Sequence, residues 1–387
     1  MLQRFLPLLL FPILYVTSCS DNDNIPMVGI GLDDVYFIPR MQKLPLRSEL
    51  TGNSYLWTVT APSGETVRTA TSRSLIFLEA EEGAYEVTLT ISGDDGTLTS
   101  TATVNVYHEE VEYSPYISRV YEYCPAPGQF INTMPEFEEG DTYGSMLEKA
   151  TRCISGTADE LISLGGWGGY VTFGFDHTLV SDPDAPELRL WGNAFYNETT
   201  DGTRGGSAEA GIIWVSFDEN CNGVPDDTWY ELAGSEFDHT VRNYAVTYTR
   251  PTADNGPIGW ADCNGNSGTQ PHLSFHSNPY FPQWLDDTEL TFTGSLLPAN
   301  ASLTAGSSSD YFLTSFPWGY ADNHPNSESA LNSFDFANAR DAAGMPVSLP
   351  GVDFVRVVTG IRQICGPIGE TSTELSRAAD LRLLPAK

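Results

Sequence analysis

Positive charge is scarce in this chain of 387 residues. It has 19 lysines and arginines against 51 aspartates and glutamates, which gives a formal net charge of −32 at pH 7. The acidic residues are spread along the chain rather than held in one tail, so its surface repels nucleic acid and phosphate-rich lipid. We therefore expect no nucleic-acid partner, and a surface that attracts hard cations.

Short catalytic motifs are also missing. The sequence has no Gly-x-Ser-x-Gly nucleophile elbow, no His-Glu-x-x-His motif and no P-loop. Acidic residues are too numerous to single out a glycosidase pair, which needs two carboxylates about 5 to 10 Å apart across a cleft. Pairings such as Asp322 with His324 arise by chance in so acidic a chain. We expect a non-catalytic protein, with a hydrolase as an alternative because β-sandwich hydrolases need no short motif.

No N-terminal apolar run is long enough to cross a membrane. Residues 5–16 are almost entirely apolar but contain two prolines, whereas a span needs about 20 apolar residues. Arg4 precedes this run, and the small residues Thr17 and Ser18 follow it before Cys19. A charged start, a short apolar run and small residues at the cleavage site are typical of a signal peptide, which we place at residues 1–18.

The end of this segment resembles the bacterial lipobox, which implies that cleavage leaves a lipidated Cys19 as the new N-terminus. The tract Ser-Asp-Asn-Asp-Asn at 20–24 resembles the surface-export signal of Bacteroidota lipoproteins. Residues 19–25 are thus expected to form a lipidated acidic tether. The alternative is an ordinary secretory signal peptide that ends on a chance cysteine. We predict a protein that is lipid-anchored in the outer membrane and faces the cell exterior.

Five cysteines remain beyond the anchor, and none forms a Cys-x-x-Cys motif, so a zinc ribbon has no support. An exported protein can form disulfides, and we predict at least one bridge. Cys221 and Cys263 are the suggested pair, since both lie in Asn-Gly loops. The five are Cys124, Cys153, Cys221, Cys263 and Cys365.

The composition favours an all-β protein of two domains. Hydrophobic residues make up 41% of the chain, enough for packed cores, and 35 glycines with 25 prolines indicate many turns. Residues 26–107 contain short alternating strands, of which 83–92 places Tyr85, Val87, Leu89 and Ile91 on one face. The Tyr-x-Trp-Thr-Val segment, the Gly-x-Tyr-x-Val-Thr-Leu-Thr strand and the Asp-Asp-Gly turn resemble the PKD-type immunoglobulin-like domain. That resemblance implies a small β-sandwich that spaces or presents its neighbour.

Residues 108–115 are acidic and are interpreted as a linker, and 116–387 as one large domain. Long glycine-flanked strands recur in it, at 169–176, 211–217, 244–249, 289–294, 333–336 and 352–358. Helices are predicted only at 146–153 and 158–164. Many strands with long intervening loops favour a jelly-roll β-sandwich.

One loop of the large domain has the pattern of a calcium site. From Asp218 onward, oxygen side chains stand at positions 1, 3, 5 and 9 around a glycine at position 6, as in an EF-hand-type loop. Position 12 is Trp229, so the closing carboxylate must be another residue. The alternative is an acidic Asn-Gly hairpin without metal. The expected ligands of a structural Ca²⁺ are Asp218, Asn220, Asn222, the carbonyl of Val224, Asp226, and either Asp227 or Glu231.

The same loop carries a family resemblance. Residues 218–236, Asp-x-Asn-x-Asn-Gly-x-Pro-Asp-Asp-x-Trp-Tyr-Glu-Leu-x-Gly-Ser-Glu, are similar to a signature of Bacteroidota PKD-containing "cell surface" lipoproteins. Segments 123–132, 191–195, 246–251, 316–323 and 369–374 extend the resemblance over nearly the whole chain. Members are often encoded near TonB-dependent receptors, including those for corrinoids. The resemblance implies capture of a ligand for uptake.

Loop aromatics suggest where a ligand binds. Planar rings beside amide and carboxylate groups suit a sugar or a corrin, through stacking and directed hydrogen bonds. His324 is a conceivable axial ligand to cobalt. The candidate residues are Trp260, Trp284, Trp318, Tyr320, Asn323 and His324, with ordinary core packing as the alternative.

These patterns together predict a surface lipoprotein that captures a glycan or a corrinoid for TonB-dependent uptake. Two alternatives remain at this stage: an adhesin or surface scaffold, and a secreted carbohydrate-active hydrolase.

Overall fold

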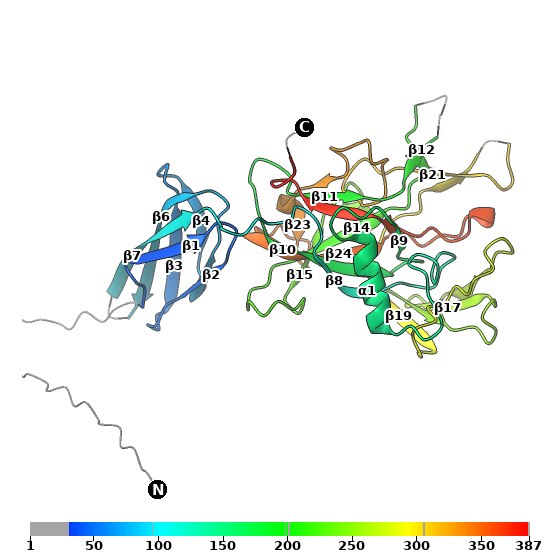
Figure 1. The fold of residues 1–387 in the computed structure, drawn as a ribbon, viewed down its shortest axis with the longest axis horizontal. Coiled ribbons are helices and arrows are strands. Elements are labelled where there is room, and N and C mark those ends of the chain that lie inside the picture. The colour runs from blue at the N-terminus through cyan, green and yellow to red at the C-terminus, as the bar shows by residue number, and fades with distance from the viewer. Residues whose placement is uncertain (1–30, 95, 198, 200–201, 305, 386–387) are drawn as a thin grey trace, which may run out of the picture.

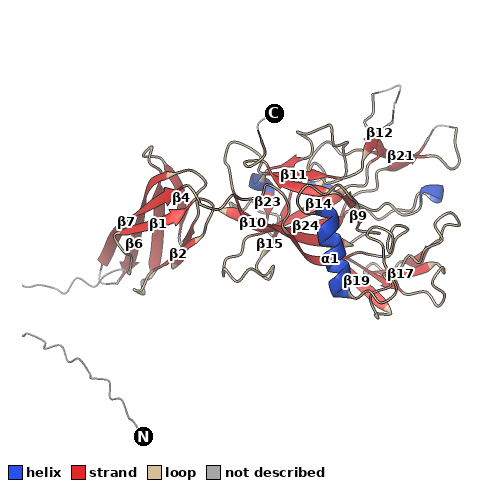
Figure 2. Cartoon of the chain, in the orientation of Figure 1, coloured by secondary structure: helices blue, strands red, loops and turns tan. Residues whose placement is uncertain are grey.

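The computed structural model describes residues 31–94, 96–197, 199, 202–304 and 306–385. In this part of the chain, 26 strands accompany one α-helix, α1 (Tyr143–Ile154), and three short 3₁₀ turns (Figure 2). The predicted all-β sandwich class is confirmed. No helix within the described ranges is both long and apolar enough to span a membrane. Cys19, the signal peptide and the tether lie outside the described residues, and their assignments remain predictions.

The first seven strands form a small domain of two sheets, with strand orders β1-β7-β6-β3-β4 and β2-β5 (Figure 1). Strand β1 runs parallel to β7, and the other pairs are antiparallel. The strands are β1 (Val35–Pro39), β2 (Leu44–Arg47), β3 (Ser54–Thr60), β4 (Thr66–Ala70), β5 (Ser74–Phe77), β6 (Gly83–Gly93) and β7 (Gly96–Tyr107).

The alternation of buried and exposed side chains along β6 explains how this domain forms its core. Tyr85, Val87, Leu89 and Ile91 are all buried, as the period-two pattern predicts, and they surround Trp57 from β3. The indole N–H of Trp57 donates to the carbonyl of Ser72 at 2.9 Å, so the ring is buried with its polar group satisfied. Residues of the opposite face, mostly threonines, remain at the surface.

The large domain is organised around a six-stranded sheet of order β23-β15-β14-β24-β10-β8. Its central strands are buried on both faces, because further sheets and α1 cover them; Val171, Ile213 and Val355 are each fully enclosed. The strands are β8 (Arg119–Cys124), β10 (Tyr170–Val180), β14 (Gly211–Ser216), β15 (Trp229–Leu232), β23 (Ala339–Arg340) and β24 (Gly351–Thr359).

Four smaller sheets complete this domain, with orders β22-β11-β26, β12-β13-β21-β20, β18-β17-β16-β19 and β25-β9. Figure 1 shows the ends of the β12-β21 and β17-β19 sheets on the side away from the small domain. Their strands are β9 (Ile162–Ser163), β11 (Leu188–Trp191), β12 (Phe195–Tyr196), β13 (Gly205–Ser207), β16 (Val241–Thr249), β17 (Ile258–Asp262), β18 (Ser267–Gln270), β19 (Glu289–Leu296), β20 (Ala301–Leu303), β21 (Tyr311–Thr314), β22 (Ser333–Phe334), β25 (Glu374–Leu375) and β26 (Arg377–Asp380).

One of the two predicted helices is confirmed and the other is wrong. Helix α1 contains the predicted segment and begins slightly earlier, behind a capping box in which Thr142 and Ser145 bond to each other's backbone N–H. The second segment, 158–164, is not helical. Its end forms β9, which pairs with β25, and Gly165 follows in the left-handed region at φ 69°. Strand pairing across the chain overrides the weak local helix preference there.

The two domains contact each other through a small apolar cluster and a half-buried lysine. Met41 and Leu78 of the small domain pack with Val180 and Phe217 of the large one. Lys43 extends from the small domain into the large one, with its ammonium 5.1 Å from the centre of the Phe217 ring. The lysine thus ends beside the loop predicted to bind calcium.

Candidate functional site

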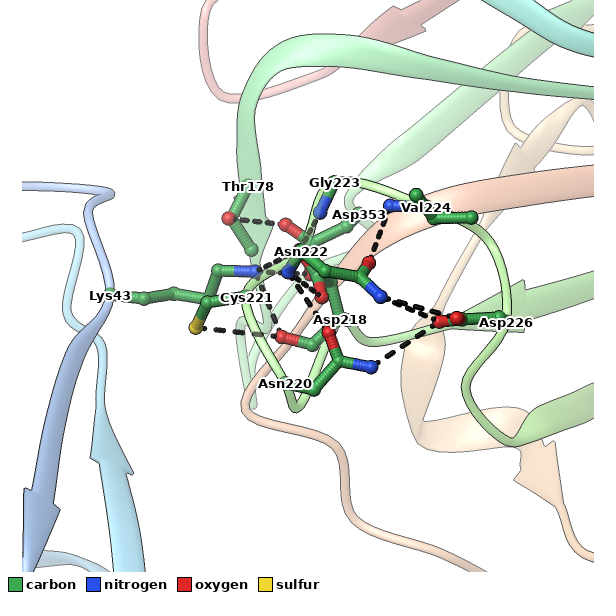
Figure 3. A network of polar contacts seen from close by, with 10 residues as sticks. All are labelled: Lys43, Thr178, Asp218, Asn220, Cys221, Asn222, Gly223, Val224, Asp226 and Asp353. Carbon is green, nitrogen blue, oxygen red and sulfur yellow. Dashed lines mark hydrogen bonds and ion pairs between the residues drawn. The ribbon is translucent and has the colours of Figure 1, made fainter.

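The predicted calcium loop connects β14 to β15 and is shaped by its own acidic and amide side chains (Figure 3). The carboxylate of Asp218 accepts the backbone N–H groups of Asn222 and Gly223, each at 3.0 Å. Asn220 Oδ1 accepts the same Asn222 N–H at 2.9 Å, and Asn222 Oδ1 accepts that of Val224 at 2.7 Å. Gly223 supplies the sharp turn at φ 71°. These bonds bring the oxygens of positions 1, 3 and 5 into one turn.

The carboxylates after the turn differ in whether their oxygens already have hydrogen-bond partners. Asp226 accepts the side-chain amide of Asn222 at 3.1 and 3.2 Å, which draws it to the same side of the loop. Oδ2 of Asp227 is buried and has no hydrogen-bond partner. Burial raises the pKa of Asp227, and the charges of Asp218 and Asp226 raise it further. Glu231 instead is buried on β15 and accepts the hydroxyl of Ser295. Asp227 therefore fits the closing carboxylate better than Glu231.

A cation of the protein itself already contacts this loop (Figure 3). Lys43 Nζ donates to the backbone carbonyl of Asp218 at 3.0 Å and lies 3.3 Å from its Oδ2. The same ammonium lies 3.1 Å from Oδ2 of Asp353, which also accepts the Asp218 N–H at 2.8 Å. The lysine lowers the repulsion between two carboxylates and joins the small domain to the loop.

Three residues predicted to contact a ligand are instead interior packing residues. Trp284 is 8% exposed and belongs to the main core. Tyr320 is 1% exposed, and its hydroxyl accepts the Glu236 N–H at 2.9 Å. Asn323 is fully buried and bonds to both backbone groups of Phe316 at 2.9 and 2.8 Å. The prediction is wrong for these three, because their loops fold under the domain and use the side chains to hold the backbone.

The remaining predicted residues do not gather in one place. His324 is buried, and its Nδ1 lies 2.7 Å from the hydroxyl of Tyr196. Burial lowers the pKa of His324, so the ring is neutral in the interior and out of reach of a bound corrinoid. Trp318 is 43% exposed, in a turn after β21. Trp260 lies on β17, in a different sheet.

Trp260 lines a pocket with a volume of about 230 Å³, beside strands β16, β17 and β18 of the β18-β17-β16-β19 sheet. Aromatic, amide and charged side chains from six stretches of the chain surround it. The lining residues are Gly166, Trp167, Tyr248, Trp260, Gln270, Ile361, Arg362, Gln363, Ile364, Glu370 and Thr371.

The tryptophan supports an arginine at this pocket. The guanidinium carbon of Arg362 lies 3.5 Å from the centre of the Trp260 ring, a cation–π contact. The ring also lies against the backbone of Gly268 on the neighbouring strand, where an added Cβ would come within 2.8 Å of it. The sequence suggested that Trp260 offers an open ring face on which a sugar can stack. The structure shows that the ring contacts Arg362 and Gly268 instead. It fixes the position of Arg362.

Arg362 has most of its hydrogen-bonding capacity left. One Nη1 bond goes to the Tyr244 hydroxyl at 3.1 Å, and Asp262 Oδ2 lies 3.9 Å away. Among the described residues its other N–H groups have no partner within hydrogen-bond distance. Since a guanidinium carries five N–H donors, several face the pocket or solvent unpaired.

Two buried polar groups at the pocket lack partners. Glu370 is 3% exposed; its Oε1 accepts the backbone N–H of Gln129, whereas its Oε2 has no hydrogen bond of ordinary geometry, although the amide of Gln270 is close enough to lower the pKa of the carboxyl. Burial raises the pKa of Glu370 to about 7. The hydroxyl of Thr371, which is 1% exposed, also has no partner. Buried polar atoms are nearly always bonded in proteins, so these two atoms still require a partner, which a water molecule or a ligand can supply.

Sequence reasoning missed Glu370 and Thr371. They belong to segment 369–374, which contributed only to the family resemblance. The sequence shows only that residues 370–376 are polar except for one leucine. In the structure all of them are buried. A run of polar residues is expected at the surface of a protein, so only the three-dimensional structure shows that this run is buried.

Next along this run lies a cluster of three carboxyl groups. Oxygens of Glu209, Asp322 and Glu374 all lie within 4.8 Å of one another. Asp322 accepts the backbone N–H groups of Asn193, Ala194 and Glu374, at 2.8 to 2.9 Å. Burial raises the pKa of Asp322 to about 6 and that of Glu374 to about 8, and raises that of Glu209 well above its usual value. The cluster therefore holds protons at neutral pH.

The disulfide prediction is wrong in this structure. All five described cysteines are free thiols. Cys221 lies in the acidic loop with its sulfur 3.9 Å from the Asp218 carbonyl, whereas the sulfur of Cys263 accepts the Ala245 N–H at 3.4 Å beside β16. The suggested partners lie in loops of different sheets, Cys221 between β14 and β15 and Cys263 between β17 and β18, and each has its own local contact.

No model of a known protein family matches the chain, and no curated protein is similar to it. Among solved structures, one titled SusE-like protein BT2857 is similar over 88% of this chain and 94% of that chain, at 10% sequence identity and a TM-score of 0.26. At so low a TM-score, the likeness assigns neither a fold nor a function to this chain.

Proposed function

We propose that this protein is a non-catalytic surface lipoprotein that captures a nutrient ligand in the Trp260–Arg362–Glu370 pocket for uptake through a TonB-dependent receptor. The observation that supports the proposal is the pair of buried, unpartnered polar atoms on Glu370 and Thr371. Leaving such a group unpaired costs about 1 to 3 kcal/mol. A ligand that bonds to both would recover that free energy.

A glycan suits this pocket better than a corrinoid does. At about 230 Å³ the pocket is smaller than the roughly 300 to 1,000 Å³ of sites for drug-sized ligands, so it suits a unit of one sugar ring. A corrin macrocycle needs a far wider surface. His324, the candidate axial ligand, is enclosed and bonded to Tyr196. We take a glycan as the ligand and a corrinoid as the less favoured one.

Binding to a panel of glycans and corrinoids, measured by calorimetry on the soluble chain without its lipid, tests the proposal. Thr371→Val removes one unpartnered hydroxyl and keeps the shape of the side chain, so affinity should fall about five-fold, the effect of one hydrogen bond. Glu370→Gln should weaken binding as well. Glu139→Gln, at an exposed acid away from the pocket, is the matched control.

Two results would contradict capture at this pocket. One is a ligand that binds with the same affinity to wild type, Thr371→Val and Glu370→Gln. If that ligand is a protein or a host surface, the result would indicate an adhesin. The other is turnover of the ligand during the titration, which would indicate a hydrolase.

The surface location rests on the lipid anchor. Cys19→Ala should remove the acylation site, so the protein should leave the membrane fraction in cell fractionation. Protease added to intact cells should degrade the wild type, because we expect it to face outward. A Cys19→Ala protein that stays with the membrane, or a wild type that intact cells protect, would refute the anchor.

A further inference from the structure

The two ends of the pocket differ in charge. Arg362 and Glu370 both line it, and no ion pair joins them in the described structure; the part at Arg362 is called the cationic end and the part at Glu370 the acidic end. Both charges act on the buried hydroxyl of Tyr248, where Arg362 lowers the pKa of the phenol and Glu370 raises it, although burial dominates and raises it overall. Tyr248, which also lines the pocket, is therefore within range of both charges. A ligand that fills the pocket meets both.

The cationic end is suited to a carboxylate. Trp260 holds the guanidinium of Arg362 flat, and only Tyr244 takes a hydrogen bond from it. Asp262, its nearest acid, is 3.9 Å away and is engaged by Tyr244 and by Asn266. An arginine fixed in this way presents a planar pair of donors, which matches the two oxygens of a carboxylate. Asp262 pairs with this guanidinium only at 3.9 Å, so on a protein of net charge −32 the remaining donors of Arg362 are a specific attraction for an anion.

The acidic end is suited to hydroxyl groups. The Thr371 hydroxyl both donates and accepts, and so does a Glu370 carboxyl that is protonated. Gln270, a buried amide, lies beside them at the same pocket. A sugar hydroxyl also both donates and accepts, so it pairs with all three groups in either direction. An ammonium group, which only donates, would leave half of that capacity unused.

We infer that the ligand of this pocket is an acidic sugar, with its carboxylate on Arg362 and its ring hydroxyls on Glu370 and Thr371. This inference rests on the proposed function, since it names the ligand class of the same pocket. The volume of about 230 Å³ admits one uronate unit, as a free sugar or at the end of an acidic glycan.

The test compares sugars that differ only at the acid. Glucuronate and galacturonate are titrated against glucose and galactose into the isotopically labelled chain, and NMR shifts give the affinities up to the millimolar range. Wild type should bind the uronates at least about 10-fold more tightly, the effect of one charge-assisted hydrogen bond. Arg362→Gln should remove this preference, so that the uronates bind no more tightly than the neutral sugars do. Arg362→Lys, which keeps the charge without the planar fork, should keep part of the preference.

Arg119→Gln is the matched control, because Arg119 stacks on Tyr121 in the same manner, 4.8 Å from the ring centre, but lines no part of this pocket. Melting temperatures of all variants check that the fold is retained. Equal affinity of wild type for uronates and neutral sugars, with loss of both in Thr371→Val, would overturn the acidic-sugar inference and leave capture at the pocket standing. If no sugar binds and the pocket resonances do not shift with any ligand of the panel, both the inference and the proposed function fail.

Discussion

Raising the pH from 5 to 8 should lower the free energy of unfolding by roughly 3 to 5 kcal/mol, since one pKa unit corresponds to about 1.36 kcal/mol. The carboxyls responsible are Glu374, with a pKa raised to about 8, and Asp322, with a pKa raised to about 6, each mainly by burial. In the unfolded chain both groups lose their protons near pH 4. The folded state therefore holds more protons in this window, and its stability is greatest at low pH and is lost as the pH rises through the folded pKa values.

Other buried titratable groups act in the same direction, and their effect adds to that of Glu374 and Asp322. Glu370 and Glu187 are buried carboxyls whose pKa values burial raises to about 7. The pKa of His177 is also raised: burial lowers it, but bonds to Asp380 and Asp176 outweigh that effect. Its contribution is present at low pH and lost as the pH rises, which adds to the same slope.

Denaturant unfolding at a series of pH values measures the effect. Glu374→Gln keeps an oxygen that accepts the hydroxyls of Ser163 and Ser372 but cannot ionise, so it should flatten much of the dependence. Glu139→Gln, an exposed acid, should leave the slope as in wild type. Stability that rises between pH 5 and pH 8 would show that this cluster is ionised in the folded protein.

Features set by neighbouring residues could be predicted from the sequence. Alternation in 83–92 located β6 and its buried face correctly, because a strand's side chains alternate with a fixed period. The acidic loop could be proposed because all its candidate ligands fall within 14 consecutive positions, from Asp218 to Glu231. The structure adds that Asp227, rather than Glu231, has the free oxygen.

Features that depend on distant residues could not be predicted. The partner of Glu370 is the backbone of Gln129, which is 241 positions away. Trp284 and Tyr320 lie among turn residues, which usually indicate surface loops, yet the loops fold back and bury both rings. The role of Trp260 depends on Arg362, which no local pattern connects to it. Sequence periodicity carries no information on such contacts.

Calcium should raise the melting temperature of the chelator-treated protein by about 5 to 10 °C. Ligand present at 100 times its dissociation constant stabilises the folded state by about 2.7 kcal/mol, and each kcal/mol shifts the melting of a domain of this size by about 2 to 4 °C. The shift arises because the oxygens of Asp218, Asn220 and Asn222 are brought into one turn only when the loop is folded. Scanning calorimetry with and without Ca²⁺ measures it for each domain.

Four variants test whether this effect belongs to the loop. Asp218→Ala and Asp226→Asn should abolish the shift, whereas Asp254→Asn, at an exposed acid in another loop, should keep it. Lys43→Met should lower stability in chelator, because it leaves the carboxylates of Asp218 and Asp353 without their cation, and should increase the affinity for Ca²⁺. Lys43 and the metal would then compete for the same carboxylate, so calcium binding and the contact between the two domains would be linked. A melt that Ca²⁺ does not change, or one that it changes equally in Asp218→Ala, would show that the loop is an acidic hairpin held by its own hydrogen bonds.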